Sequence, residues 1–449
     1  MIFTPAPRID RPPPVQHTVS MNDIHTRLAA LGVGIPEILL PHSGIDLSKW
    51  AVIACDQFTQ DIQYWEQVKN TVAGAPSCLN LIFPEAYLEA AGLKDGKDRA
   101  ARVRGIRDCM DAYIKGDTFA PPRRCCVYLE RATSHNPKRR GLVLSLDLER
   151  YDWAPESRPL IRSTEGTVTE RLPPRIEIRR GAPLELPHIL ILIDDEEDRL
   201  IPSIGEIAGK GAPLYKTPLM MGSGAVSGWA ADTEDAWRLL ADGLQALAEK
   251  ADRRYGTSCE QPFLFAVGDG NHSLATAKAV WEEYKKAHAG EEGLLQHPAR
   301  WALVEIENIY DPGISFEPIH RVIFGIGEKE LLEALSAVPG ITCQPGAVSN
   351  TIRIESLSPG IVTAALQPFL DSFVAARGFS MDYIHGESEV QRITATAHAG
   401  AAVGLILPPV RKDGFFKTVA RHGPLPRKSF SMGEAEEKRF YLECRKLFL

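Results

Sequence analysis

Apolar residues along this chain follow two different spacings, and stretches with each spacing alternate from end to end. Ile62, Trp65, Val68 and Val72 recur every three or four residues, so a helix is predicted over residues 60–74. The same spacing predicts helices over three further stretches: residues 98–114, 233–254 and 433–448.

Short apolar runs between these helices predict strands. Residues 124–133 and 141–153 flank a basic turn at residues 135–140, which predicts a β-hairpin. Further strands are predicted at residues 50–56, 189–193, 262–267, 301–306, 316–323 and 401–407. Because strands and helices interleave, we assign a mixed α/β (α+β) fold class, in one large globular unit with a flexible N-terminal tail.

Three segments are expected along the chain. The proline-rich residues 1–34 are predicted to form the flexible tail. Residues 35–160 are expected to form an N-terminal α/β lobe, and residues 161–449 a main α/β lobe that carries the turn described below.

The composition narrows the class of protein. Hydrophobic residues make up 44% of the chain and charged residues 24%, which predicts a sizeable core. The net charge of −7 disfavours a nucleic-acid partner. The longest apolar runs are too short to cross a membrane, and the chain opens without an apolar signal segment. Eight cysteines form no C-x-x-C pair, so we expect reduced thiols and a cytoplasmic protein.

The stretch AVGDGNHSLATA, residues 266–277, links a predicted strand directly to a predicted helix. Gly268 and Gly270 allow a sharp bend, and a helix that starts near Asn271 points its free N–H groups back at that bend. Such a helix end binds anions, most often phosphate. His272 could contact the anion, and Asp269 could hold a metal ion or orient a base. The alternative is an ordinary turn, since Asp and Asn are common turn and cap residues.

Residues 161–171 form a second polar stretch, which has no helical or strand period. It is either a solvated loop or an active-site loop. The residues that could take part in chemistry there are Arg162, Glu165, Thr167 and Arg171.

Two more segments carry cations suited to an anionic ligand. His320 and Arg321 lie in the predicted strand at residues 316–323, where an edge-strand surface role is the alternative. Residues 414–433 are predicted to be a basic loop before a helix, or a solvated face, and contain Lys417, Arg421, Arg427, Lys428 and Ser429.

Three familiar site motifs are missing or incomplete. The glycines at 222, 224 and 228 miss the dinucleotide-binding spacing by one residue, and no Walker-type phosphate loop is present. His272, His320 and His385 do not have the spacing of zinc ligands.

Several segments together resemble the domain-of-unknown-function family numbered 1015. They are IPEILLPHSGIDLSKWAVIACDQFT, LIRSTEGTVTERLPPRIEIRRGAPLELPHILILIDD, VGDGNHSLATAK, FEPIHRV and LPRKSFSMGEAEEKRFYLE. The resemblance covers nearly the whole chain from about residue 35 onward. The family name itself records no activity.

A second resemblance concerns the turn alone. Many members of that family carry Asp-Gly-His-His-Arg there, which resembles the phosphate-contacting motif of the ParB/sulfiredoxin-like group with its free-serine kinases. Asp269, Gly270 and His272 match this motif, whereas Asn271 and Ser273 depart from it. The departure at 273 removes an arginine that would clamp phosphate, and we expect Arg162, Arg321 or Lys428 to supply that charge.

The resemblance implies a cytoplasmic small-molecule phosphotransferase that uses ATP or ADP with Mg²⁺. In this hypothesis Glu165 or Asp56 is the base, Asp269 binds the metal ion, and His272 acts on the phosphates. The expected nucleotide contacts are Gly270, Asn271, Ser273, Arg162, His320, Arg321, Arg427 and Lys428. The alternatives are a nucleotide- or ligand-responsive regulatory protein with little turnover and a metal-dependent hydrolase.

Overall fold

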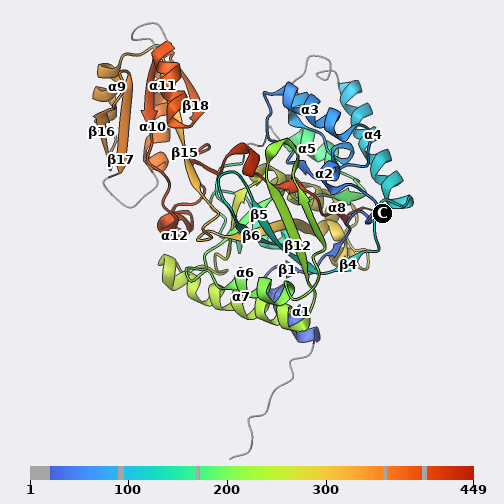
Figure 1. The fold of residues 1–449 in the computed structure, drawn as a ribbon. Coiled ribbons are helices and arrows are strands. Elements are labelled where there is room, and N and C mark those ends of the chain that lie inside the picture. Colours follow the sequence, from blue (N-terminus) through green and yellow to red (C-terminus); the bar gives the residue numbers. More distant parts are fainter. Residues whose placement is uncertain are drawn as a thin grey trace, which may run out of the picture.

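The protein is represented by a computed structural model. The structure describes residues 21–88, 96–167, 169, 172–356, 362–396 and 402–448. Figure 1 shows a large body built around one sheet and a smaller body that contains α9, α10 and α11. The predicted mixed α/β class is confirmed.

Ten strands of the described residues form one mixed sheet, in which β1 (Val33–Gly34) pairs with β6 beside the main path. The predicted hairpin is confirmed, because β5 and β6 pair antiparallel. Along the path the strands are β11 (Tyr215–Pro218), β12 (Ala225–Ala231), β5 (Cys126–Ala132), β6 (Arg139–Asp147), β14 (Trp301–Asn308), β10 (Leu190–Ile193), β13 (Phe265–Asp269), β8 (Ile161–Ser163) and β7 (Tyr151–Asp152).

Alternate residues of the central strands face two different cores. Leu142 and Leu144 pack with one group of helices, whereas Val143 packs with another. On the first face lie α1 (Met21–Ala30), α6 (Leu200–Ala208), α7 (Glu234–Tyr255) and α8 (Asn271–Ala287). The second face is covered by segments that include α2 (Leu47–Trp50), α3 (Ile62–Val72), α4 (Gly96–Lys115) and the C-terminal stretch.

The smaller body is a second mixed sheet with helices on both faces. Leu331 of α9 and Leu366 of α10 pack on one face, and Val390 of α11 packs on the other. The elements are β16 (Ile341–Pro345), β17 (Thr351–Ser356), β19 (Ala402–Ile406), β15 (Phe316–Phe324), β18 (Ser380–His385), β20 (Phe430–Met432), α9 (Glu328–Leu335), α10 (Val362–Arg377) and α11 (Glu387–Thr396).

The helix predicted over residues 433–448 is wrong. After a short 3-10 helix at Ala435–Glu437 the segment is extended. The strand β21 (Phe440–Tyr441) pairs with β3 (Val52–Ile53), and β22 (Arg445–Lys446) pairs with β9 (Leu184–Glu185). Because most of the segment is buried, it carries apolar residues on both faces, and this pattern imitates a helical period.

Three further expectations differ from the structure. Ile24 and Leu28 of α1 are buried in the core, so the packed chain includes residues 21–34 of the predicted tail. The predicted lobe boundary at residue 160 falls inside the large sheet. The predicted basic loop begins as a helix, α12 (Lys412–His422), which carries Lys417 and Arg421.

Arg439 is the buried cation that ties the C-terminal segment to the sheet. Its Nη1 lies 2.7 Å from Glu305 Oε2, and its Nη2 pairs with Glu443. Removal of one member of a buried ion pair leaves an uncompensated charge, so we expect Arg439→Met to lower the free energy of unfolding by about 3–5 kcal/mol.

Urea denaturation measures this loss. Arg377→Met is the matched control, because Arg377 pairs with Glu330 at a side-chain exposure of 56% and an exposed pair contributes about 0.2–1 kcal/mol. Equal losses in the two variants would contradict the role given to Arg439.

Candidate functional site

The turn between β13 and α8 has the predicted form. Gly270 has a φ of 79°, and a Cβ added there would lie 3.1 Å from the Ile189 Cα, so the turn requires glycine. Oδ1 of Asp269 accepts the Gly270 N–H at 3.0 Å. Among the described residues no side chain caps the start of α8, so its positive end faces the turn.

The two polar stretches predicted from sequence lie side by side. The Thr164 N–H donates to Asn271 Oδ1 at 3.3 Å, and its hydroxyl donates to the Val267 carbonyl at 2.5 Å. Glu165 then forms a parallel bridge with Leu425. Asn271, which departs from the family motif, therefore joins the end of β8 to the start of α8.

Lys438 is a site residue that the sequence did not reveal. Its Nζ lies 3.4 Å from Asp269 Oδ2, and its side chain is only 9% exposed. The sequence pattern predicts a helix over residues 433–448, and such a helix gives no reason to expect Lys438 beside the turn between β13 and α8. A signal was present in hindsight, since Lys438 lies within the family-like segment LPRKSFSMGEAEEKRFYLE.

Glu165 has an unusual protonation equilibrium. Burial raises the pKa of its carboxyl to about 7, Lys428 and Arg427 act in the opposite direction, and the nearby Asp269 carboxylate adds to the rise. Lys428 has a left-handed φ of 60°, a conformation that non-glycine residues rarely adopt and that recurs at functional sites.

Asp56 has the opposite protonation behaviour. Burial alone would raise the pKa of its carboxyl, but His188, Gln57, Arg175 and Lys438 together hold that pKa below its usual value. Asp56 therefore stays ionised at neutral pH, and its Oδ2 lies 3.8 Å from Nε2 of His188.

His188 was also missed by the sequence interpretation. Its Nε2 lies 2.7 Å from Ser273 Oγ, and its Nδ1 lies 2.7 Å from the Tyr441 hydroxyl. Ser273, which we expected at the phosphates, is thus hydrogen-bonded to an imidazole. His272 is half-buried in the same helical turn, and its carbonyl accepts the Thr276 hydroxyl at 2.7 Å.

Arg162 does not face the turn. Its guanidinium carbon lies 4.6 Å from the centre of the Phe263 ring, and its Nε donates to the Pro159 carbonyl at 2.9 Å. Residue 162 pairs with Ala266 in the sheet, and its side chain packs with the aromatic core behind the turn. The sequence pattern indicates the right segment but not the direction in which the Arg162 side chain points.

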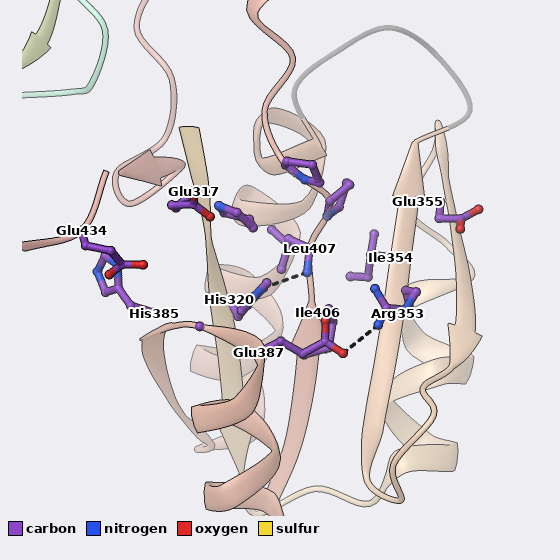
Figure 2. Close-up of a pocket in the computed structure, with 14 residues that line it drawn as sticks. Glu317, His320, Arg353, Ile354, Glu355, His385, Glu387, Ile406, Leu407 and Glu434 are labelled. Carbon is purple, nitrogen blue, oxygen red and sulfur yellow. Dashed lines mark hydrogen bonds and ion pairs between the residues drawn. The ribbon is translucent and has the colours of Figure 1, made fainter. Parts of the chain in front are cut away.

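His320 and Arg321 belong to the smaller body. His320 Nδ1 accepts the Leu407 N–H at 3.1 Å, and the ring borders a cavity of about 430 Å³ that also holds the ion pair of Arg353 with Glu387 (Figure 2). Burial lowers the pKa of His320 to about 4, so it is neutral. Arg321 is fully buried, and its Nη2 donates to Gln367 Oε1 at 2.8 Å.

The remaining predicted cations divide into two groups. Arg427 and Lys428 act on Glu165 electrostatically, as described above. Arg421 Nε donates to the Tyr255 carbonyl at 2.7 Å, so it holds α12 against α7. Arg171 lies outside the described residues.

The described residues give no support for a metal site formed by protein ligands alone. Among the described residues no group of three or more His, Cys, Asp and Glu side chains is placed to hold a metal ion. In the same part of the chain, no helix is both long enough and apolar enough for a membrane span.

The model of the family described as "Protein of unknown function (DUF1015)" matches residues 39–443. The chain belongs to this family. No curated protein matches the chain.

Several solved structures are similar to this chain. A conserved hypothetical protein from Pyrococcus furiosus has 11% identity and a TM-score of 0.33, with 68% of this chain and 95% of that chain covered. A free serine kinase variant in complex with AMP has 10% identity and a TM-score of 0.35, with 67% and 90% covered. A free serine kinase variant in complex with ADP has 10% identity and the same score, with 67% and 91% covered.

The raised pKa of Glu165 predicts a pH-dependent stability. The carboxyl binds its proton more tightly in the folded than in the unfolded chain, so ionisation between about pH 4.5 and 7 costs folded-state stability. Relative to Glu165→Gln, the wild-type free energy of unfolding should fall by roughly 1–3 kcal/mol across this window. Urea denaturation at a series of pH values measures the difference.

Asp56→Asn is the matched variant, for which we expect the opposite pH dependence of stability. The pKa of the Asp56 carboxyl is lowered in the folded chain, so the ionised carboxylate stabilises the protein at neutral pH. This contribution disappears as the pH falls through the folded-state pKa. A stability difference between wild type and Glu165→Gln that does not vary with pH would contradict the environment assigned to Glu165.

Proposed function

We propose that the protein is a nucleotide-dependent phosphotransferase that acts on a hydroxyl group of a small molecule. The observation that supports this most strongly is the pairing of charges at the start of α8. Glu165, with a pKa of about 7, lies near Asp269, and the ammonium of Lys438 lies 3.4 Å from the Asp269 carboxylate.

The start of α8 supplies the phosphate site in this proposal. The 17-residue helix directs its positive end at a turn without a side-chain cap, and Gly270 lets this turn pack closely against Ile189. Lys438 adds an ammonium group beside this helix end, and Lys428 acts electrostatically on the nearby Glu165. Lys438 thus takes the place of the arginine that the family motif carries at residue 273.

Two carboxyl groups with opposite pKa shifts have different roles in the proposed reaction. A general base functions best when its pKa lies near the working pH, which fits Glu165. Asp56 is held ionised by its cationic neighbours and contributes negative charge without a proton transfer. Glu165 takes the proton of the acceptor hydroxyl, the oxygen bonds to phosphorus, and the bond to the leaving nucleotide breaks.

Asp269 is the residue that would hold Mg²⁺. Its side chain is 27% exposed, so one carboxylate oxygen can be reached from solvent. Mg²⁺ is usually bound by one or two carboxylates together with phosphate oxygens and water, and therefore needs no larger protein cage. The ion would neutralise charge on the phosphates during transfer.

Lys438→Met tests the phosphate site. Loss of a charge-assisted hydrogen bond should weaken Mg²⁺–ADP or Mg²⁺–ATP binding by about 10- to 100-fold, as measured by calorimetry. Lys69→Met is the matched control, because the Lys69 side chain is 69% exposed on α3. Unchanged nucleotide affinity in Lys438→Met would remove Lys438 from the site.

Glu165→Gln separates an enzyme from a regulatory binding protein. We expect nucleotide affinity within a few-fold of wild type, while phosphoryl transfer to serine and other small hydroxyl compounds falls by about 10²–10⁴. The measurement is nucleotide turnover with each acceptor. Nucleotide binding without turnover by the wild-type protein would favour the regulatory alternative.

A further inference from the structure

A hydrogen-bonded chain of four side chains runs beside the phosphate site. Ser273 Oγ lies 2.7 Å from His188 Nε2, and His188 Nδ1 lies 2.7 Å from the Tyr441 hydroxyl. Tyr441 in turn donates to Cys55 Sγ at 3.2 Å. A hydroxyl within hydrogen-bond reach of an imidazole that a third group orients is the arrangement of an activated nucleophile.

Activation of Ser273 requires the tautomer of His188 that carries its proton on Nδ1. The Tyr441 hydroxyl donates to Cys55 Sγ, so its oxygen can accept from Nδ1–H of His188. In this tautomer Nε2 carries the lone pair and accepts the Ser273 hydroxyl proton. Burial raises the pKa of the Tyr441 phenol well above its usual value, so this orienting group stays neutral.

Asp56 lies near the same ring nitrogen of His188 as Ser273 does. Its ionised carboxylate lies 3.8 Å from His188 Nε2 and stabilises the imidazolium that forms when His188 takes a proton. Ser273 lies in the first turn of α8, where the positive end of the helix favours negative charge on or beside the serine oxygen.

Ser273 and His188 line a cavity of about 130 Å³ whose surface is mostly apolar. Its walls include Phe83, Met110 and Ile178, together with the ion pairs of Arg175 with Glu85 and of Arg179 with Glu185. The volume has room for about ten water-sized groups, which suits an acyl chain of about four to eight carbons. The phosphotransferase proposal gives this cavity no role.

We infer that Ser273 is the nucleophile, and His188 its general base, of a site that hydrolyses carboxylic esters with a short apolar acyl chain. Ser273 Oγ bonds to the carbonyl carbon and its proton passes to His188 Nε2. The bond to the alkoxy group breaks, and His188 returns the proton to the leaving alcohol. Water then attacks the acyl-serine by the same route, so ester and water yield acid and alcohol.

The test needs no nucleotide, so its result is independent of the proposed phosphotransferase. Full-length protein is treated with a fluorophosphonate, and the modified residue is located by mass spectrometry. Hydrolysis of p-nitrophenyl acetate, butyrate, hexanoate and dodecanoate is measured in parallel. We expect modification of Ser273 and the fastest hydrolysis with butyrate or hexanoate.

Variants separate catalysis from folding. Ser273→Ala and His188→Gln should each lower the ester hydrolysis rate at least about 100-fold with melting temperatures near that of wild type. Ser372→Ala is the matched control, because Ser372 is an exposed helical serine whose hydroxyl bonds to the Pro368 carbonyl. If Ser273→Ala does not fold, labelling of the wild type and the rate of His188→Gln still decide.

Three results would overturn the inference: no fluorophosphonate adduct, an adduct on another residue, or ester hydrolysis that survives in Ser273→Ala. None of these would affect nucleotide binding at Lys438. Conversely, if the protein transferred no phosphoryl group, a fluorophosphonate adduct on Ser273 would still support the Ser273–His188 pair.

Discussion

The buried charges around Arg439 hold together the parts of the molecule that form the candidate site. Glu305 on β14 and Glu443 both pair with this guanidinium in the interior of the large body. Unpaired charges in such surroundings are strongly unfavourable, so the C-terminal segment has one position in which its charges are compensated. Lys438 and Tyr441 flank Arg439 and are carried into the site by that position.

Two further arginines fix the same segment through its backbone. Arg131 on β5 donates to the carbonyls of Glu436, at 2.5 Å, and of Glu437, at 3.2 Å. Arg139 on β6 donates to the Glu437 carbonyl at 2.9 Å. The sheet therefore holds the segment by directional bonds to backbone groups just before Lys438, and the ammonium of Lys438 reaches Asp269 from a rigid support.

Segments held in fixed positions in this way explain why two carboxyl groups of the candidate site differ in acid strength. Glu165 is half-buried near another carboxylate and keeps its proton up to about neutral pH. Asp56 is surrounded by cationic groups and loses its proton well below that. The difference comes from the segments that surround each carboxyl group, which lie far apart in the sequence and meet only in the fold.

Local patterns predicted local structure well. The hairpin of β5 and β6, the helix α7 and the strand-to-helix turn at Gly270 follow from periodicity and from glycine at a left-handed position. The prediction of a C-terminal helix was wrong because this mostly buried segment has apolar residues on both faces, whatever its conformation.

Only the site residues that stand out within their own short stretch of sequence could be predicted. Asp269 and Glu165 stand out as polar residues at breaks in the apolar pattern, and the structure places their segments side by side. His188 and Lys438 reach the turn from other parts of the chain through sheet pairing and buried ion pairs, which no local pattern encodes. The direction of the Arg162 side chain was equally a matter of tertiary packing.

The most direct measurement of the central claim is a crystal structure of the protein with ADP and Mg²⁺. The account predicts phosphate oxygens at the first turn of α8, within hydrogen-bond distance of the Lys438 ammonium, and Mg²⁺ at the Asp269 carboxylate. Nucleotide bound elsewhere, for example in the cavity beside His320, would contradict the assignment of the turn as the phosphate site.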